Sequence, residues 1–447
     1  MIRSTEFAKQ LKANQEGEMK KSMEFDEDEF PEGGFGWFVV LASWCGMACT
    51  FGMVNSFGVY QSFYQTELYS GEKTFKINII GSLQPACMYF FCTATVYLHH
   101  YFGVQLTVAL GAFIQVFSLM MMSITNSIWQ LFLTQGVLFG FGSGIIYFSA
   151  LTIPMHWFKR KKAFAIGIAS SGSSIGGVIW PIAVRRLISE VGVNWTNRIL
   201  GFIYIPVAVI LLLFLRPRLP VKLQETDYFL SLYRFRFYYD LTILKSRKYL
   251  ILLFAFIISQ MALFPGLFLT DLYGQRLAHK LHRSLFDPAY YVTLLNAASL
   301  FGRILPGFLA DVFGRLNVLI PFMLLSGILP LSLWLNSSSS DIVFLIFDVT
   351  WGFSSGVVIS LFPTLVPQLF GIEKNQSRMG ILFTLAGIGA LFGPIICGAF
   401  LPLAGSVEQY ITDFKRVAIF IGVLFLVAGG SLCSLRLLIS KSLFQIL

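Results

Sequence analysis

Charged residues are scarce in this chain, and their scarcity excludes an ordinary soluble protein. Asp, Glu, Lys and Arg make up only 13% of the 447 residues, whereas 56% are hydrophobic. The mean hydropathy is +0.71. A soluble domain of usual composition carries about 25% charged residues. We therefore expect an integral membrane protein.

Other missing features narrow the class. The first 34 residues lack the short apolar core of a cleavable signal peptide, so the first apolar segment is expected to direct insertion itself. No Gly-x-x-x-x-Gly-Lys-[Ser/Thr] loop is present, so coupling to ATP through such a loop is excluded. The six cysteines all fall in apolar segments without the paired spacing of a metal site. They are expected to be free thiols, and no cofactor is predicted.

Long apolar runs are present instead, and they recur along the whole chain. A helix of about 20 apolar residues spans the hydrocarbon core of a bilayer. The sequence predicts twelve such spans, at 35–60, 77–98, 104–124, 128–153, 163–184, 198–215, 249–271, 289–310, 316–335, 341–365, 379–402 and 415–438.

Basic residues predict the orientation of these spans. With both termini in the cytosol, most of the 33 Lys and Arg fall on the cytosolic side, above all at Lys159–Lys162 and in the segment 216–248. The net charge of +10 therefore indicates topology and contact with anionic lipid, and not nucleic-acid binding. The predicted organisation is an acidic cytosolic tail (1–34), a six-helix bundle (35–215), a basic cytosolic linker (216–248), a second six-helix bundle (249–438) and a cytosolic tail (439–447).

An internal repeat supports two related halves. The stretch GFGSG at Gly140–Gly144 matches GFSSG at Gly352–Gly356, 212 residues later. Further pairs keep nearly the same offset: Gly167 with Gly380, Gly176 with Gly389, Pro181 with Pro394, Leu98 with Leu309, Phe102 with Phe313 and Gly103 with Gly314. Paired helical halves with a binding site between them at mid-membrane are typical of secondary transporters.

The stretch GFLADVFGR at Gly307–Arg315 resembles the signature of the major facilitator superfamily, Gly-x-Leu-Ala-Asp-x-x-Gly-Arg. The resemblance implies an all-α membrane fold of 12 transmembrane helices in two homologous six-helix bundles. In that family the Asp and Arg form part of a charge latch that holds one state of alternating access, which assigns this role to Asp311 and Arg315. At the matching turn of the first half, His100 stands in place of the Asp and Gln105 near the basic position.

Two further stretches resemble the monocarboxylate transporter (monocarboxylate porter) family, in its fungal-like branch. They are PEGGFGW at Pro31–Trp37, before the first helix, and HWFKRKKAFAIGIASSGSSIGGVIWP at His156–Pro181, leading into the fifth. The resemblance implies a monocarboxylate-like or riboflavin-like substrate. Proton-coupled members carry a lysine late in helix 1 and an Asp in helix 8. These positions are Asn55 and Ser299 here, and both are candidate substrate-binding residues.

Arg303 is the main candidate for binding substrate. It lies inside an apolar span, where a charge exposed to lipid costs at least about 2.5–3.5 kcal/mol. Asn296 and Ser299 share its helix face, so this polar stripe is expected to line a central cavity. A guanidinium matches carboxylates and other planar acceptors with two hydrogen bonds. The alternative is structural pairing within the bundle.

Asp348 is the candidate for proton coupling. It shares a helix face with Gly352 and Ser355 in the tenth predicted span, which favours an inward orientation. Three interpretations remain open: titration during transport, neutralisation of Arg303 in one conformation, and a position shallow enough to reach outer water. Tyr147 and Trp351 are further candidates for the cavity wall, with helix packing as the alternative.

The sequence therefore predicts a secondary transporter that moves a small organic solute by alternating access. It is expected to be a monomer in the plasma membrane rather than the vacuolar membrane. The alternative is a non-transporting sensor on the same fold, signalling through the acidic tail or the basic linker. An enzyme is not predicted, because no credible catalytic cluster is present.

Overall fold

The computed structural model describes residues 31–69, 74–218, 241–281, 290–371, 374–401 and 407–440. Within these ranges the chain forms helices, turns and bends and no strand. The predicted acidic tail up to residue 30, the linker between 219 and 240 and the final residues from 441 lie outside the described residues.

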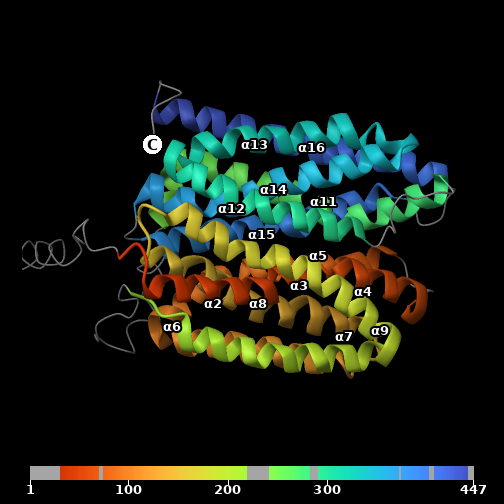
Figure 1. Cartoon of the computed structure of the whole chain (residues 1–447), viewed down its shortest axis with the longest axis horizontal. Helices are drawn as coiled ribbons and strands as arrows, with labels where there is room; N and C mark the ends of the chain where they lie inside the picture. The colour runs from red at the N-terminus through yellow and green to blue at the C-terminus, as the bar shows by residue number, and fades with distance from the viewer. Residues whose placement is uncertain are drawn as a thin grey trace, which may run out of the picture.

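The helices follow one another with short connections (Figure 1). Their bounds are α2 (Phe35–Cys49), α3 (Phe51–Val54), α4 (Phe57–Phe63), α5 (Thr74–Phe90), α6 (Cys92–Met122), α7 (Ile128–Leu131), α8 (Phe139–Thr152), α9 (Lys162–Phe214), α11 (Arg247–Leu281), α12 (Tyr291–Phe313), α13 (Arg315–Leu329), α14 (Asp341–Phe370), α15 (Asn375–Ala399) and α16 (Val407–Ile439). Short π-helical turns at Tyr64–Leu68, Phe132–Leu138 and Pro330–Trp334, and 3-10 turns at Ile153–His156, Leu241–Lys245 and Ser337–Ser339, extend or join them.

Ten helical stretches among the described residues are long and apolar enough to cross a membrane. Two of these stretches reverse direction at a glycine with positive φ, α6 at Gly103 (φ 77°) and α9 at Gly192 (φ 77°). Glycine takes this conformation without the steric penalty of a Cβ atom. The first part of α6 continues the crossing that α5 begins. The described chain therefore contains the twelve crossings that hydropathy predicts.

The helices run beyond the predicted apolar spans. The fifth span is predicted to end at 184, but helical structure continues through Arg185, Arg186 and Glu190 to the turn at Gly192. Hydropathy marks only the part of a helix that can lie in hydrocarbon. A polar residue does not by itself end a helix, because the backbone hydrogen bonds continue.

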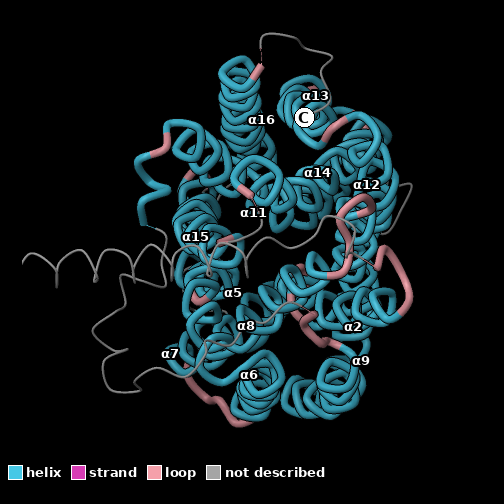
Figure 2. Tube along the Cα trace, turned by 90° about the vertical axis from the view of Figure 1, so that its left-hand side faces the viewer, coloured by secondary structure: helices cyan, strands magenta, loops and turns pink. Residues whose placement is uncertain are grey.

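The crossings form two groups that pack side by side. Seen end-on in Figure 2, α2, α5, α6, α8 and α9 form one group and α11 to α16 the other. The groups meet where α9 packs on α12 and where α5 packs on α15.

The duplicated glycine motif performs the same packing task in each group. A Cβ atom on Gly144 of α8 would lie 2.5 Å from the carbonyl oxygen of Met88 on α5. A Cβ atom on Gly356 of α14 would lie 2.6 Å from the carbonyl oxygen of Ser299 on α12. Small residues permit such close approach of helix backbones in lipid. The sequence repeat is therefore a repeat of tertiary contacts.

Candidate functional site

Arg303 lies between the two groups of helices and is buried, with 1% of its surface exposed. Its Nε donates to Ser299 Oγ on the same helix at 3.2 Å. Its Nη1 donates to the carbonyl oxygen of Ser170, on α9, at 2.6 Å and also to Ser173 Oγ. All of these acceptors are neutral. Among the described residues no carboxylate forms an ion pair with this guanidinium.

An asparagine pair also joins the two groups of helices. Asn55, just after the short helix α3, donates from Nδ2 to Asn296 Oδ1 on α12 at 3.0 Å. Asn296 Nδ2 donates to the carbonyl oxygen of Val292 at 2.9 Å. The buried Oδ1 of Asn55 has no hydrogen-bond partner among the described residues. The predicted stripe of Asn296, Ser299 and Arg303 thus faces the other bundle, where it makes direct contacts rather than lining an open cavity.

Five aromatic side chains gather beside this stripe, and we call them the aromatic cluster. They are Phe51 of α3, Tyr89 of α5, Tyr147 of α8, Phe264 of α11 and Phe383 of α15. Neighbouring ring centroids lie 5.2–6.0 Å apart.

The aromatic cluster adjoins Arg303 directly. The Cζ atom of Arg303 lies 6.0 Å from the centroid of Phe51, within the range of a cation–π contact. Tyr89 Oη donates to Gln260 Oε1 at 3.3 Å. Of the cluster, only Tyr147 is among the residues singled out in the sequence. The other four carry no distinguishing signal in a chain with 46 phenylalanines and 17 tyrosines.

Trp351 and Asp348 lie apart from this cluster, inside the C-terminal bundle. Trp351 Nε1 donates to the carbonyl oxygen of Ser326 on α13 at 3.2 Å, and its ring packs near Phe347 and Phe425. Asp348 is 0% exposed, so it does not reach outer water in this conformation. It forms no ion pair with Arg303.

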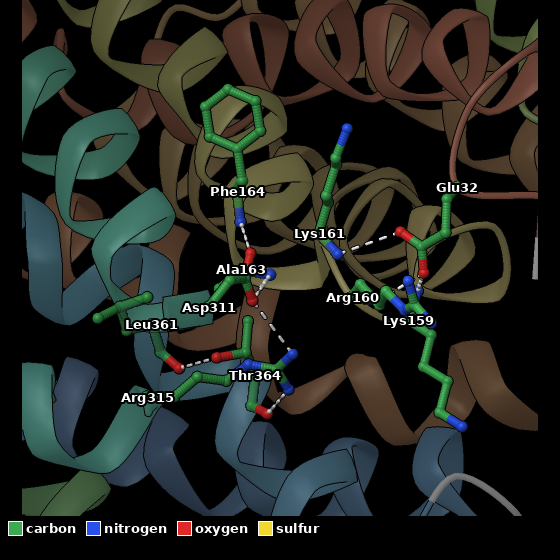
Figure 3. Close-up of polar contacts among 10 residues, drawn as sticks. All are labelled: Glu32, Lys159, Arg160, Lys161, Ala163, Phe164, Asp311, Arg315, Leu361 and Thr364. Carbon is green, nitrogen blue, oxygen red and sulfur yellow. Dashed lines mark hydrogen bonds and ion pairs between the residues drawn. The ribbon is translucent and has the colours of Figure 1, made fainter. Parts of the chain in front are cut away.

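The structure brings Asp311 and Arg315 together near the start of α9, at the end of the bundle that carries the basic run Lys159–Lys162 (Figure 3). Arg315 Nη2 lies 3.3 Å from Asp311 Oδ1. The two oxygens of Asp311 also accept the backbone N–H groups of Ala163 (3.0 Å) and Phe164 (2.8 Å), at the start of α9. A helix N-terminus presents free N–H groups that favour a negative charge. Asp311 thereby connects the C-terminal bundle to the N-terminal one.

A second carboxylate holds the chain just before α9. The oxygens of Glu32 accept the backbone N–H groups of Lys159 (2.6 Å), Arg160 (2.5 Å) and Lys161 (3.1 Å) (Figure 3). Glu32 has a φ of 49°, unlike every other non-glycine residue that the structure describes. Such a backbone is strained and persists only where the surrounding contacts determine it. The two motifs PEGGFGW and HWFKRKK therefore meet in space.

Comparison with known proteins agrees with this architecture. The Major Facilitator Superfamily model matches residues 36–394 and 272–442. The chain is 34% identical to the MFS transporter asaE of Aspergillus flavus over 407 residues, which cover 90% of this chain and 87% of that protein. It is 33% identical to the aspyridones efflux protein apdF of Emericella nidulans over 402 residues, covering 89% and 79%.

A solved structure shares the fold. The nucleoside transporter NupG superimposes with a TM-score of 0.66 at 12% identity, covering 90% of this chain and 100% of that one. The twelve crossings, the two packed bundles and the matched superfamily model agree. The chain belongs to the Major Facilitator Superfamily and is a multi-pass secondary transporter of the membrane.

Proposed function

We propose that the protein exports a ring-bearing organic solute that carries an acid or another planar acceptor, by alternating access. The observation that carries the proposal is a buried guanidinium, Arg303, whose partners are all neutral and which adjoins the aromatic cluster. An anionic group would supply the missing counter-charge, with two hydrogen bonds in a suitable geometry. The rings of the cluster suit an aromatic or otherwise flat apolar body.

The relatives support the direction and class of transport. One of them is named as an efflux protein for aspyridones. The resemblance to monocarboxylate porters supports an acid group, and the riboflavin alternative supports a flat ring system. We infer that a ring-bearing acid suits both Arg303 and the aromatic cluster. Lactate lacks rings for the cluster, and riboflavin lacks a negative charge for Arg303. The free acceptor Asn55 Oδ1 would receive a hydroxyl or N–H donor of the solute.

Substrate binding would also loosen the closed arrangement. Arg303 now bonds Ser170 and Ser173 on α9, across the interface between the bundles. A solute anion that takes the guanidinium removes these contacts. A ligand shifts a conformational equilibrium by its difference in affinity for the two states. Competition for Arg303 therefore links solute binding to movement of α9 against α12.

The test is transport in proteoliposomes that contain the full chain, with a panel of aromatic acids, lactate, pyruvate, dicarboxylates and riboflavin. We expect an aromatic acid to move and Arg303→Gln to reduce its transport at least tenfold. Arg303→Lys should recover little, because an ammonium cannot form the two parallel hydrogen bonds of a guanidinium.

A second arginine of the same bundle provides the control for loss of a positive charge. Arg276 lies on α11 of the same bundle, against the ring of Tyr410, with its Cζ atom 4.7 Å from the centroid. Arg276→Gln should transport like the unchanged protein. Equal transport by Arg303→Gln at equal protein level would overturn the role of Arg303. Movement of no panel member would overturn the proposed substrate class and favour the sensor alternative.

We also propose that the protein acts as a monomer in the plasma membrane with both termini in the cytosol. The basic run Lys159–Lys162 at one end of the bundle supports this orientation, because basic segments favour the cytosolic side. Epitope tags at the two termini should become accessible to antibody only after the plasma membrane is permeabilised. A tag that is accessible on intact cells would reverse the orientation.

A further inference from the structure

The membrane crossing formed by α5 and the first part of α6 is interrupted beside the aromatic cluster. The helix α5 ends at Phe90 and α6 begins at Cys92, so regular helical bonding stops at Phe91. Phe91 lies twelve residues before the turn at Gly103, about 18 Å along a helix, which places the interruption deep within the crossing. Hydrocarbon offers no water to backbone N–H and carbonyl groups, so neighbouring side chains must pair them.

Thr384 on α15 supplies such a side chain. Its hydroxyl oxygen accepts the N–H of Thr93, in the first turn of α6, at 3.2 Å, and its hydroxyl group donates to the carbonyl oxygen of Phe90 at 3.2 Å. The hydroxyl of Thr93 lies 2.5 Å from the same oxygen and can donate to its second lone pair. One threonine of the C-terminal bundle thus pairs backbone groups on both sides of the interruption in the N-terminal bundle.

The face of α15 that carries Thr384 fits closely against this point. Gly380 and Gly387 lie on the same face, about one turn before and one turn after Thr384. An added Cβ atom at Gly380 would lie 3.3 Å from the Cα atom of Thr93, and one at Gly387 would lie 2.7 Å from the ring of Phe90. Small residues let helix backbones approach closely in lipid. The two glycines therefore bring the Thr384 hydroxyl within reach of the backbone.

The internal repeat relates this contact to the one made by Arg303. Gly380 is the repeat partner of Gly167 on α9, and an added Cβ atom at Gly167 would lie 2.4 Å from the carbonyl oxygen of Arg303. The packing of α15 on α6 therefore corresponds to the packing of α9 on α12. A cation joins the bundles at one interface, and a pair of threonines joins them at its counterpart.

The Thr384 contact also determines where Tyr89 lies. The carbonyl oxygen of Tyr89, in the last turn of α5, is 3.4 Å from Thr384 Oγ1. Phe383, next to Thr384 in the chain, packs its ring against that of Tyr89 with the centroids 5.2 Å apart. One turn of α15 therefore holds both the backbone and the ring of this member of the aromatic cluster.

Loss of the contact would change the path of the helix. Without the Thr384 hydroxyl, the N–H of Thr93 and the carbonyl of Phe90 can be paired in lipid by completing the helix through Phe91. Phe91 now has φ −85° and ψ −2°, whereas a regular helix has about −63° and −42°. Completion of the helix therefore rotates α5 against α6 and moves the ring of Tyr89.

We propose that Thr384 is a positioning residue for the solute site, which acts by keeping the crossing interrupted at Phe91 and Tyr89 in the aromatic cluster. When α15 separates from α5 and α6, the helix closes and the ring of Tyr89 leaves a bound ring. Arg303 then recognises the charge of the solute, and Thr384, through Tyr89, sets the affinity for its ring. The effect on transport rests on the proposed function, although the effect on Tyr89 does not.

The effect on Tyr89 can be measured without any solute, by fluorine NMR of the full chain in lipid nanodiscs with 3-fluorotyrosine at position 89. We expect Thr384→Val, which removes the hydroxyl, to shift the resonance. Thr384→Ser keeps the hydroxyl and should restore the original position. Thr350→Val is the matched control, because the Thr350 hydroxyl bonds only carbonyl oxygens of its own helix, those of Ile346 and Phe347. Its spectrum should match that of the unchanged chain.

A second variant keeps the test decisive if Thr384→Val does not fold. Thr384→Ala removes the hydroxyl without a second methyl group and should give the same shift. A resonance that stays in place in the variants without the hydroxyl overturns the proposal. An equal shift in Thr384→Ser also overturns it, because side-chain volume and not the hydroxyl would then hold Tyr89.

The effect on transport is measured in the proteoliposomes with a transported ring-bearing acid. Thr384→Val should raise its KM about threefold to tenfold, the worth of one aromatic contact, and Thr384→Ser should leave the KM near that of the unchanged chain. An unchanged KM in Thr384→Val would contradict the role in ring recognition. If no solute moves while the Tyr89 resonance behaves as expected, the proposed substrate class fails and the positioning of Tyr89 by Thr384 stands.

Discussion

At the scale of single residues, the interface between the bundles contains the buried cation of Arg303. No carboxylate among the described residues forms an ion pair with it. Arg303 is satisfied only by serine and carbonyl oxygens, and Asn55 retains an unused acceptor. A fully structural arginine inside a bundle would be expected to find a carboxylate, since buried charges are usually paired. The incomplete pairing is what favours a binding role.

The asparagine pair gives a prediction at this scale. Asn296→Ala removes the acceptor of Asn55 Nδ2 and leaves a buried donor unpaired, which should lower the free energy of unfolding by about 1–3 kcal/mol. Asn55→Ala should also destabilise the protein. The double variant should cost less than the sum of the single ones, because neither partner is then left alone. A double-mutant cycle on unfolding in detergent measures this, and strict additivity would contradict the direct contact.

At the scale of helices, hydropathy predicts most of the architecture and little of the site. The twelve crossings follow from apolar length, and the Arg303 stripe follows from helical spacing, because both depend on local sequence. The aromatic cluster draws five rings from five helices, so no local pattern reveals it. The sequence makes Trp351 as good a candidate for the cavity wall as Tyr147. In the structure, however, the Trp351 side chain faces Ser326 on α13 and not the interface between the bundles.

The duplicated glycines give a prediction for helix packing. Gly356→Val places branched methyl groups against the backbone of Ser299, so α12 and α14 must separate. We expect a loss of about 3 kcal/mol and a similar loss for Gly144→Val in the other bundle. Gly430→Ala is the control, because nothing lies within 4 Å of its added Cβ atom. Its melting temperature should stay close to that of the unchanged chain, and equal stability of all three variants would refute the packing role.

At the scale of the whole molecule, contacts from both bundles meet at the N-terminus of α9. Asp311 of the C-terminal bundle and Glu32 of the N-terminal segment both accept N–H groups there. Of these two carboxylates, Asp311 is the one that contacts the other bundle, so its contacts are among those that must break when this end of the bundle opens. Glu32 stays with its own bundle and sets the position of the chain that leads into α9.

Because Asp311 contacts the other bundle and Glu32 contacts its own, replacing each carboxylate by an amide should have a different effect. Asp311→Asn replaces charge-assisted hydrogen bonds worth about 1.5–3 kcal/mol each, so amide hydrogen exchange at Ala163 and Phe164 should rise at least tenfold and inward-open forms should gain population. Glu32→Gln should speed exchange at residues 159–161 and leave the interface between the bundles closed.

Hydrogen exchange followed by mass spectrometry distinguishes residues 159–161 from the start of α9. Asp413→Asn, near the first residues of α16, serves as the control. If Asp311→Asn leaves the exchange of α9 and α12 unchanged, the cross-bundle contact does not hold the cytosolic side shut. The packing of α9 on α12 around Arg303 would then be the stronger closure. In that case separation of α9 from α12 around Arg303, and not release of Asp311, would be the step that opens this end of the transporter.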